Sequence, residues 1–123
     1  MQIGALKFLY DIQQACRAVA QFTAGKTLAE YEADLLLRSA VERQLMIVGE
    51  ALNRLMKIEP AVTSTITAVR QIIGFRNILV HGYDVIRDRE VWKILEDDLP
   101  APTREVDSLL KQGDDELAAA EET

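Results

Sequence analysis

The chain has 123 residues, and its 14 basic and 20 acidic side chains give a formal charge of −6, which argues against a protein that coats nucleic acid through bulk charge. The length fits one domain with a real hydrophobic core, and 49% hydrophobic residues exclude a wholly disordered chain. One cysteine, Cys16, excludes an internal disulfide and a multi-cysteine zinc site, and one histidine, His81, excludes a paired-histidine metal site.

The first half of the chain is predicted to be helical. Apolar residues recur at spacings of three and four over residues 4–22, which predicts an amphipathic helix that stops at Gly25. Residues 27–30 have the reciprocal spacing of a capping box and predict a short helical turn. From Asp34 the pattern continues for about 24 residues, which predicts the longest helix. Its apolar face is wide enough to be covered on more than one side.

The second half is also predicted to be helical, with two interruptions at prolines. Pro60 begins a predicted loop through Thr65, and helical spacing resumes over residues 66–80 until Gly82 ends or bends the helix. Residues 91–99 are then expected to form a helical segment, and residues 100–102 a break at two prolines. Residues 106–110 are expected to form a last helix that ends before Gly113.

These elements predict an all-α fold, an up-and-down bundle of four to five antiparallel helices over residues 1–113. Residues 114–123 carry five acids and no base, which is typical of a disordered, solvated tail. The longest apolar run, residues 72–75, is far shorter than the ~18 residues of a membrane-spanning helix. Without an export signal as well, the chain is expected to be cytoplasmic.

One octapeptide, residues 76–83, brings an arginine, an amide, the histidine and a phenol together. On a regular helix Asn77 and His81 share a face, whereas Arg76 and His81 point about 140° apart. Their convergence would need a distorted helix, an arginine that wraps around, or a second copy of the chain across a two-fold axis. From the residues alone, a packing role for His81, a bracing role for Asn77 and a core position for Tyr83 remain alternatives.

The motif Arg76-Asn77-x-Leu79-x-His81-Gly82-Tyr83 resembles the Arg-x4-His-x-Tyr signature of the HepT-like ribonuclease toxins, a branch of the HEPN superfamily. The resemblance continues in residues outside the motif and spans about residues 8–110: residues 11–12, Arg43, 47–51, 72–75, 91–92 and 96–100. It implies a HEPN-like helical domain that dimerises and cuts RNA without a metal ion or other cofactor.

The chemistry that the resemblance implies suits these side chains. His81 would act as the base that removes the proton of a ribose 2′-hydroxyl, since imidazole titrates near neutrality. Arg76 would stabilise the charge that develops on the attacked phosphate, leaving a 2′,3′-cyclic phosphate. Asn77 would orient His81 or donate a hydrogen bond to a phosphate oxygen. No metal site is required.

The resemblance also implies a partner, a small nucleotidyltransferase antitoxin that transfers AMP to Tyr83. The added charge and bulk would block RNA entry two residues from His81. The expected function is therefore a metal-independent endoribonuclease toxin of a toxin–antitoxin pair. The expected assembly is a homodimer with the helices that carry Arg76 and His81 near the two-fold axis. The alternative is a non-catalytic HEPN subunit that binds and regulates the nucleotidyltransferase.

Other residues have two interpretations each. Four basic residues outside the motif are candidate contacts for RNA or the partner, with ordinary solvated charge as the alternative: Arg43, Arg87, Arg89 and Lys93. Arg43 and Glu50 lie seven residues apart on one helix face and also fit ion pairing. Asp11 has the same two interpretations, a hydrogen bond to a neighbouring helix or a place in the RNA-facing patch. Trp92 is expected to anchor the core or the dimer, and Cys16 to be inert packing.

The acidic excess lies outside the segment that carries the motif. Residues 36–93 contain nine basic and six acidic side chains, so this segment is net positive although the whole chain is negative. Such a local excess suffices for a few phosphate contacts but not for broad coating of nucleic acid.

Overall fold

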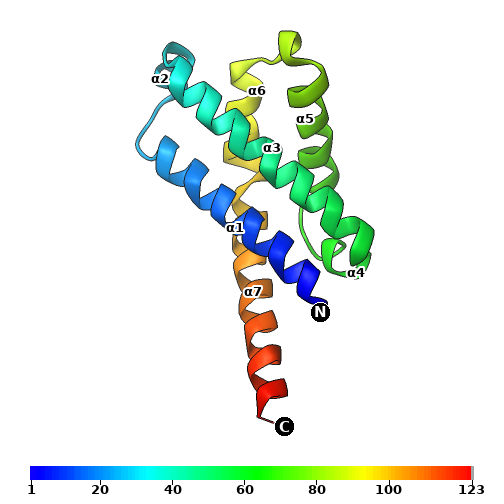
Figure 1. The fold of residues 1–123 in the computed structure, drawn as a ribbon. Helices are drawn as coiled ribbons and strands as arrows, with labels where there is room; N and C mark the ends of the chain where they lie inside the picture. Colours follow the sequence, from blue (N-terminus) through cyan, green and yellow to red (C-terminus); the bar gives the residue numbers. More distant parts are fainter. Residues whose placement is uncertain (123) are drawn as a thin grey trace.

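The computed structural model describes residues 1–122, and this range is helical with no β-strand. Four long helices form the body: α1 (Ile3–Thr23), α3 (Leu35–Ile58), α5 (Val69–His81) and α7 (Pro100–Glu121). Short elements connect them: α2 (Leu28–Ala33), α4 (Pro60–Thr63), the single 3₁₀ turn η1 (Tyr83–Val85), α6 (Asp88–Lys93) and the π-helical η2 (Ile94–Asp98). The predicted all-α bundle is confirmed (Figure 1). No helix in the described range is long and apolar enough to cross a membrane.

Helix α3 is the centre of the bundle. Helix α1 packs along one side of α3, α5 packs along another, and α7 packs on α1 (Figure 1). The wide apolar face predicted for α3 is therefore confirmed, because α1 and α5 both cover it. Leu45 and Leu52 of α3 are almost fully buried, as are Leu9 of α1 and Val106 of α7. Burying one such leucine contributes about 1.5–3 kcal/mol to stability.

The predicted helix starts in the first half are also confirmed. The Thr27 hydroxyl accepts a hydrogen bond from the Glu30 backbone N–H at 3.2 Å, and the Glu30 carboxylate accepts one from the Thr27 N–H at 3.1 Å. Asp34 caps α3 by accepting from the Leu37 N–H at 3.1 Å. Gly25, with φ of 72°, lies in the turn that follows α1, as expected of a left-handed glycine.

Three predicted boundaries in the second half are wrong. Pro60 opens α4 instead of a loop, and the predicted break at residues 100–102 is instead the first turn of α7. A proline is tolerated in the first turn because the backbone N–H that it lacks would have no helical partner there. Helix α5 starts at Val69 rather than at residue 66, because Ala68 has a left-handed φ of 62° that cannot continue a right-handed helix.

The last helix is longer than predicted. It does not stop before Gly113 but continues to Glu121, so residues 114–121 are helical rather than a disordered tail. Gly113 is buried against α1, where an added Cβ would overlap the side chain of Leu6. A residue interpreted as a stop is thus a packing contact between α7 and α1. The division of the chain after residue 113 stays a prediction, and Thr123 lies outside the described residues.

Candidate active site

Helix α5 carries the first six residues of the octapeptide, and Gly82 and Tyr83 follow its end. The helix runs to His81, and Gly82 follows as its C-terminal cap, with its N–H donating to the Ile78 carbonyl at 2.7 Å. Three apolar side chains anchor the inner face of α5 in the core: Ile72, Phe75 and Leu79. The prediction that Gly82 ends this helix is confirmed, and no distortion precedes it.

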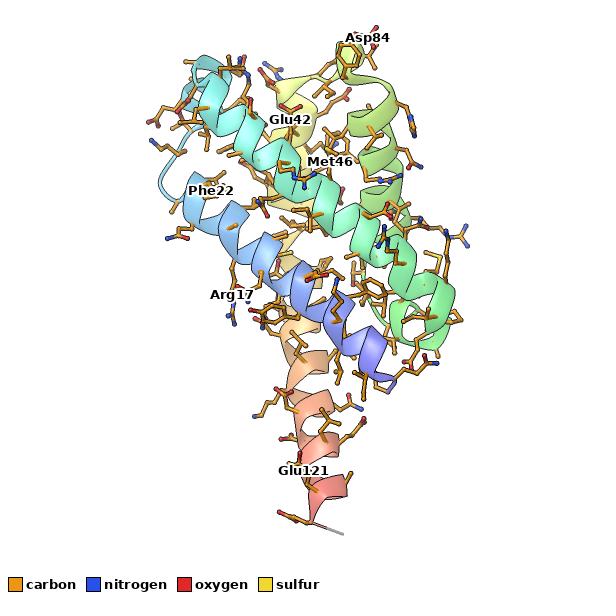
Figure 2. The ribbon with its side chains drawn as sticks, viewed as in Figure 1. Arg17, Phe22, Glu42, Met46, Asp84 and Glu121 are labelled. Carbon is orange, nitrogen blue, oxygen red and sulfur yellow. The ribbon has the colours of Figure 1, made fainter. Side chains whose placement is uncertain are left out.

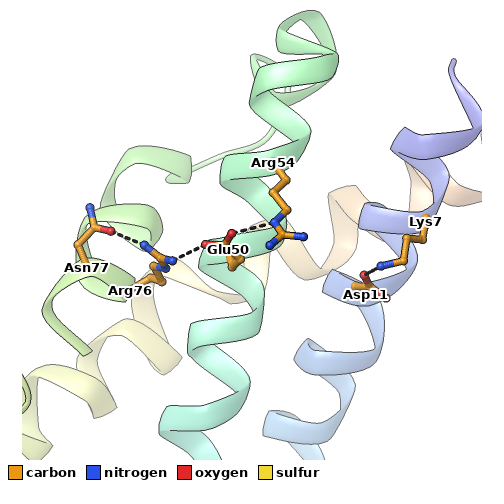
Figure 3. A network of polar contacts seen from close by, with 6 residues as sticks. All are labelled: Lys7, Asp11, Glu50, Arg54, Arg76 and Asn77. Carbon is orange, nitrogen blue, oxygen red and sulfur yellow. Dashed lines mark hydrogen bonds and ion pairs between the residues drawn. The ribbon is translucent and has the colours of Figure 1, made fainter. Parts of the chain in front are cut away.

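Arg76 is held by two neighbours, Glu50 on α3 and Asn77 on its own helix. Its side chain is 23% exposed, and its Nη2 donates to Glu50 Oε2 while its Nη1 donates to Asn77 Oδ1 at 2.9 Å. Glu50 also accepts from Nε of Arg54 at 2.8 Å, so one carboxylate lies between two guanidinium groups (Figure 3). The guanidinium of Arg76 is therefore fixed in place before any substrate arrives.

The charge of Glu50 is stabilised by these arginines. The hydrogen bond from Arg54 is the largest cause that lowers the pKa of the Glu50 carboxyl, burial opposes it, and the charge of Arg76 lowers the pKa further. Glu50 is thus ionised at neutral pH. Since it is shared by two cations, one positive charge is left uncompensated in this cluster. The predicted ion pairing of Glu50 is confirmed, with Arg54 and Arg76 as its partners rather than Arg43.

His81 points away from this cluster. It is exposed at the end of α5, and its imidazole makes no hydrogen bond or ion pair within residues 1–122. Asn77, also exposed, bonds Arg76 rather than His81. Two of the three routes to convergence, a distorted helix and a wrapping arginine, are therefore wrong for the isolated chain. The exposure of His81 also contradicts a packed, structural role.

Tyr83 lies just beyond His81 at the tip of the molecule. It begins the 3₁₀ turn η1, and 78% of the residue is exposed, which contradicts the alternative of a core aromatic. Asp84, the next residue, marks this tip in Figure 2. The phenol is therefore accessible to another protein, while the helix before it is anchored by its buried inner face.

A groove lies between α1, α3 and the Arg76 side of α5, with a volume of about 430 Å³; we call it the α1–α3–α5 groove. Six charged side chains line it: Lys7, Asp11, Arg43, Glu50, Arg54 and Arg76. Of the candidate contacts outside the motif, Arg43 lies in this groove. Arg87, Arg89 and Lys93 do not line it, although all three are exposed.

Sequence reasoning missed the contribution of α1 to this groove. Lys7 lies on its wall and pairs with Asp11 at 3.1 Å, so the predicted bond from Asp11 to a neighbouring helix is wrong (Figure 3). The spacing of Arg43 and Glu50 already indicated a shared charged face on α3, and Arg54 extends it. No sequence signal, however, says which helix packs beside that face.

Two further residues have the packing roles that were predicted for them. The ring of Trp92 packs against buried Tyr31, with 5.3 Å between ring centroids, which is a core contact. Cys16 is 1% exposed, and burial, the largest cause, raises the pKa of its thiol. A buried thiol with a raised pKa is a poor nucleophile, so no chemistry is assigned to it.

Comparisons with known proteins place this chain in a family. Residues 12–109 match the family model described as ribonuclease HepT-like. The chain is 34% identical to "Putative RNase MJ1380" of Methanocaldococcus jannaschii over 81% of this chain and 91% of the relative. It is 27% identical to "Probable ribonuclease HepT" of Thermococcus cleftensis over 85% of this chain and 94% of the relative. No solved structure matches it significantly. The chain belongs to the HepT-like ribonuclease family.

Proposed function

We propose that this protein is a metal-independent endoribonuclease, the toxin of a toxin–antitoxin pair, and that it cuts RNA with Arg76 and His81. The observation that carries the proposal is a guanidinium fixed by Glu50 and Asn77 on the same helix that ends in an exposed imidazole. In a chain of a ribonuclease family, a fixed cation and a free base on one helix are the two groups that a phosphodiester transesterification needs.

The proposed reaction gives each of the three groups a role. His81 takes the proton of the 2′-hydroxyl, and the 2′-oxygen attacks the adjacent phosphorus. The bond to the 5′-oxygen then breaks, and the imidazolium returns a proton to that leaving oxygen. Arg76 uses two of its five N–H groups on Glu50 and Asn77, so three remain for the extra negative charge of the phosphorane. The free amide nitrogen of Asn77 donates to a phosphate oxygen.

The site requires a second copy of the chain in this proposal. Arg76 faces α3 while His81 faces outward, so one chain does not aim both groups at one phosphate. A homodimer with its α5 helices near the two-fold axis brings an Arg76 and a His81 from different copies together. Ile78 of α5 is 42% exposed and would supply apolar contact.

Sedimentation velocity tests the dimer. The wild-type protein is expected to sediment as a dimer, and Ile78→Glu as a monomer, because it places a charge in the proposed interface. Leu117→Glu is the matched control, since Leu117 is 44% exposed on α7, away from α5. A monomeric wild-type protein would contradict this arrangement.

Cleavage of single-stranded RNA in the presence of a metal chelator tests the chemistry. His81→Ala and Arg76→Ala are each expected to lose at least about 100-fold in rate. Arg70→Ala, which removes an exposed arginine from the same helix, is expected to keep the wild-type rate. Mass spectrometry should find 2′,3′-cyclic phosphate ends. Wild-type cleavage by His81→Ala would refute the mechanism.

Induced expression in a bacterium tests the toxin role separately from the chemistry. Growth arrest that disappears with His81→Ala supports a toxin. Harmless expression of the wild-type protein would favour the non-catalytic subunit instead, because such a subunit needs no active nuclease.

We propose further that a nucleotidyltransferase antitoxin neutralises the nuclease by transferring AMP to Tyr83. Support comes from the exposed phenol on η1, two residues from His81. An AMP group there would place negative charge where the RNA phosphate enters. Intact mass after coexpression with the partner should show AMP adducts that vanish in Tyr83→Phe but persist in Tyr10→Phe, whose tyrosine is 55% exposed on α1. Adducts that survive Tyr83→Phe would refute this assignment.

A further inference from the structure

We propose that the α1–α3–α5 groove is a nucleotide subsite, which binds the nucleotide of single-stranded RNA next to the cut phosphate. This inference rests on the proposed nuclease function and names a part of its substrate site that no motif residue other than Arg76 reaches. The groove volume of about 430 Å³ lies within the ~300–1,000 Å³ of small-ligand sites. Its occupant is defined by the charge of its walls, the character of its floor and its position beside α5.

The walls of the groove carry two positive charges without a matching carboxylate. Glu50 is shared by Arg54 and Arg76, which leaves one positive charge, and Asp11 neutralises Lys7. Arg43 makes no ion pair within residues 1–122, which leaves the second. A site that is net positive by two charges, with guanidinium groups to supply them, suits phosphate oxygens.

The floor of the groove is apolar. Four hydrophobic side chains form most of it: Phe8, Met46, Ile47 and Val80. Phe8, Met46 and Ile47 pack against the core while keeping part of their surface open. Lys7 Nζ lies over the Phe8 ring, 5.5 Å from its centre, so a cation and an aromatic ring adjoin at the groove. A nucleobase has a flat, apolar face that stacks on such a ring, and a phosphate at its side that pairs with arginine.

The groove is continuous with the proposed catalytic residues. Arg76 and Val80 lie four residues apart on α5 and both line the groove. Asn77 and His81 lie one residue further along on the adjacent, outward face of the same helix. An RNA strand whose scissile phosphate lies between His81 of one copy and Arg76 of the other therefore has its neighbouring nucleotide at the groove that this Arg76 borders.

A second copy of the chain is the competing occupant. The cores of protein–protein interfaces are depleted of charged residues. This groove has six charged side chains, and its excess is of one sign, so two copies related by a two-fold axis would bring like charges together. Charge complementarity favours a polyanion over another copy of the same surface.

The test measures binding of a fluorescent, mixed-sequence 2′-O-methyl RNA to the full-length protein. This probe lacks the attacking hydroxyl, so binding is measured without cleavage. Arg43→Gln is expected to weaken binding about tenfold. It should also lower the slope of log affinity against log salt by about 0.7, the value for one phosphate contact of a single strand. Arg17→Gln is the matched control, because Arg17 is an exposed arginine of α1 whose ion-pair partner is Asp107 outside the groove.

Photocrosslinking locates the base. A probe that carries 5-iodouridine should attach to the tryptic peptides of residues 8–17 and 44–54, which contain Phe8 and Met46. Phe8→Leu keeps an apolar floor but removes the ring, so it should reduce the crosslink to residues 8–17. Crosslinks confined to other peptides would overturn the subsite.

The remaining outcomes separate the subsite from the nuclease function. If Arg43→Gln binds and responds to salt like Arg17→Gln, the subsite is wrong, even where RNA cleavage still depends on His81. If Arg43→Gln instead dissociates a dimer, a second copy fills the groove and the inference is also overturned. If groove-dependent RNA binding is present but His81→Ala does not alter cleavage, the subsite stands and the proposed mechanism fails.

Discussion

Replacing Gly49 by alanine is expected to destabilise the protein, although alanine is the better helix former. Gly49 is buried where α3 meets α5. A Cβ on Gly49 would lie 2.8 Å from Cγ of Arg76, closer still to its Cβ, and 3.3 Å from the Ile72 carbonyl oxygen. Ordinary contact starts at 3.4 Å. Cβ of Arg76 is fixed by the backbone of α5, so α3 and α5 must separate at this point, and α5 carries Arg76 with it.

The size of the effect follows from two opposing contributions. Overpacking of a close helix contact costs about 1–3 kcal/mol, and replacing a mid-helix glycine by alanine gains about 1 kcal/mol. Gly49→Ala should thus lower the free energy of unfolding by up to about 2 kcal/mol. Gly74→Ala is the matched control, since Gly74 lies inside α5 with no atom within 4 Å of the added Cβ, and it should gain up to about 1 kcal/mol.

Urea unfolding followed by circular dichroism measures both variants. The difference between them, about 1–3 kcal/mol, is free of most errors in the denatured-state reference, because both replace a helical glycine by alanine. RNA cleavage should fall in Gly49→Ala and stay unchanged in Gly74→Ala. Equal stabilisation by the two substitutions would refute the close approach of α3 and α5 at Gly49.

Three further predictions concern other parts of the fold. Burial, followed by the nearby charge of Asp88, raises the pKa of Glu42 above its ordinary 4.5, so the ionised side chain opposes folding. Glu42→Gln should therefore be more stable than wild type at pH 7. The gain should shrink as the pH falls through the raised pKa toward 4.5 and be largely gone below 4.5, where the carboxyl is protonated in both the folded and the unfolded chain. A gain in urea midpoint that does not depend on pH would contradict this. Thr27→Ala removes the capping box with Glu30 and should cost about 1 kcal/mol on urea unfolding, whereas no loss would mean that α2 needs no cap. Cys16 should react with Ellman's reagent only after denaturation, and rapid reaction of the native protein would contradict its burial.

The parts of the fold that were predictable depend on local patterns. Periodic apolar residues located the long helices, and the capping box at Thr27 and the stop at Gly82 were correct because each acts within a few residues. The errors have a different origin. Pro100 is compatible with a helix start or a break, and the chain context decides between them. Gly113 reads as a stop, yet it is a buried contact with Leu6, more than 100 residues away.

The candidate site also has a part that was predictable from local sequence and a part that was not. The motif residues were predictable because Arg76, Asn77, His81 and Tyr83 lie within eight residues of one another, and their assignment as a site stays a prediction. Helical spacing correctly gave the divergence of Arg76 and His81. The partner of Arg76 was not predictable, because Glu50 reaches it only through the packing of α3 on α5.

That packing explains why one arginine can serve both the proposed cut site and the proposed subsite. Because Gly49 has no side chain, α5 approaches α3 closely enough for Arg76 to reach Glu50. Glu50 in turn is bound by Arg54, so the carboxylate that orients Arg76 is itself fixed in position. A flexible surface arginine would lose side-chain entropy on binding a phosphate, whereas here that ordering is already present in the folded chain. The geometry of the site is therefore a consequence of helix packing, and a small shift of α5 at Gly49 should disturb cleavage and groove binding together.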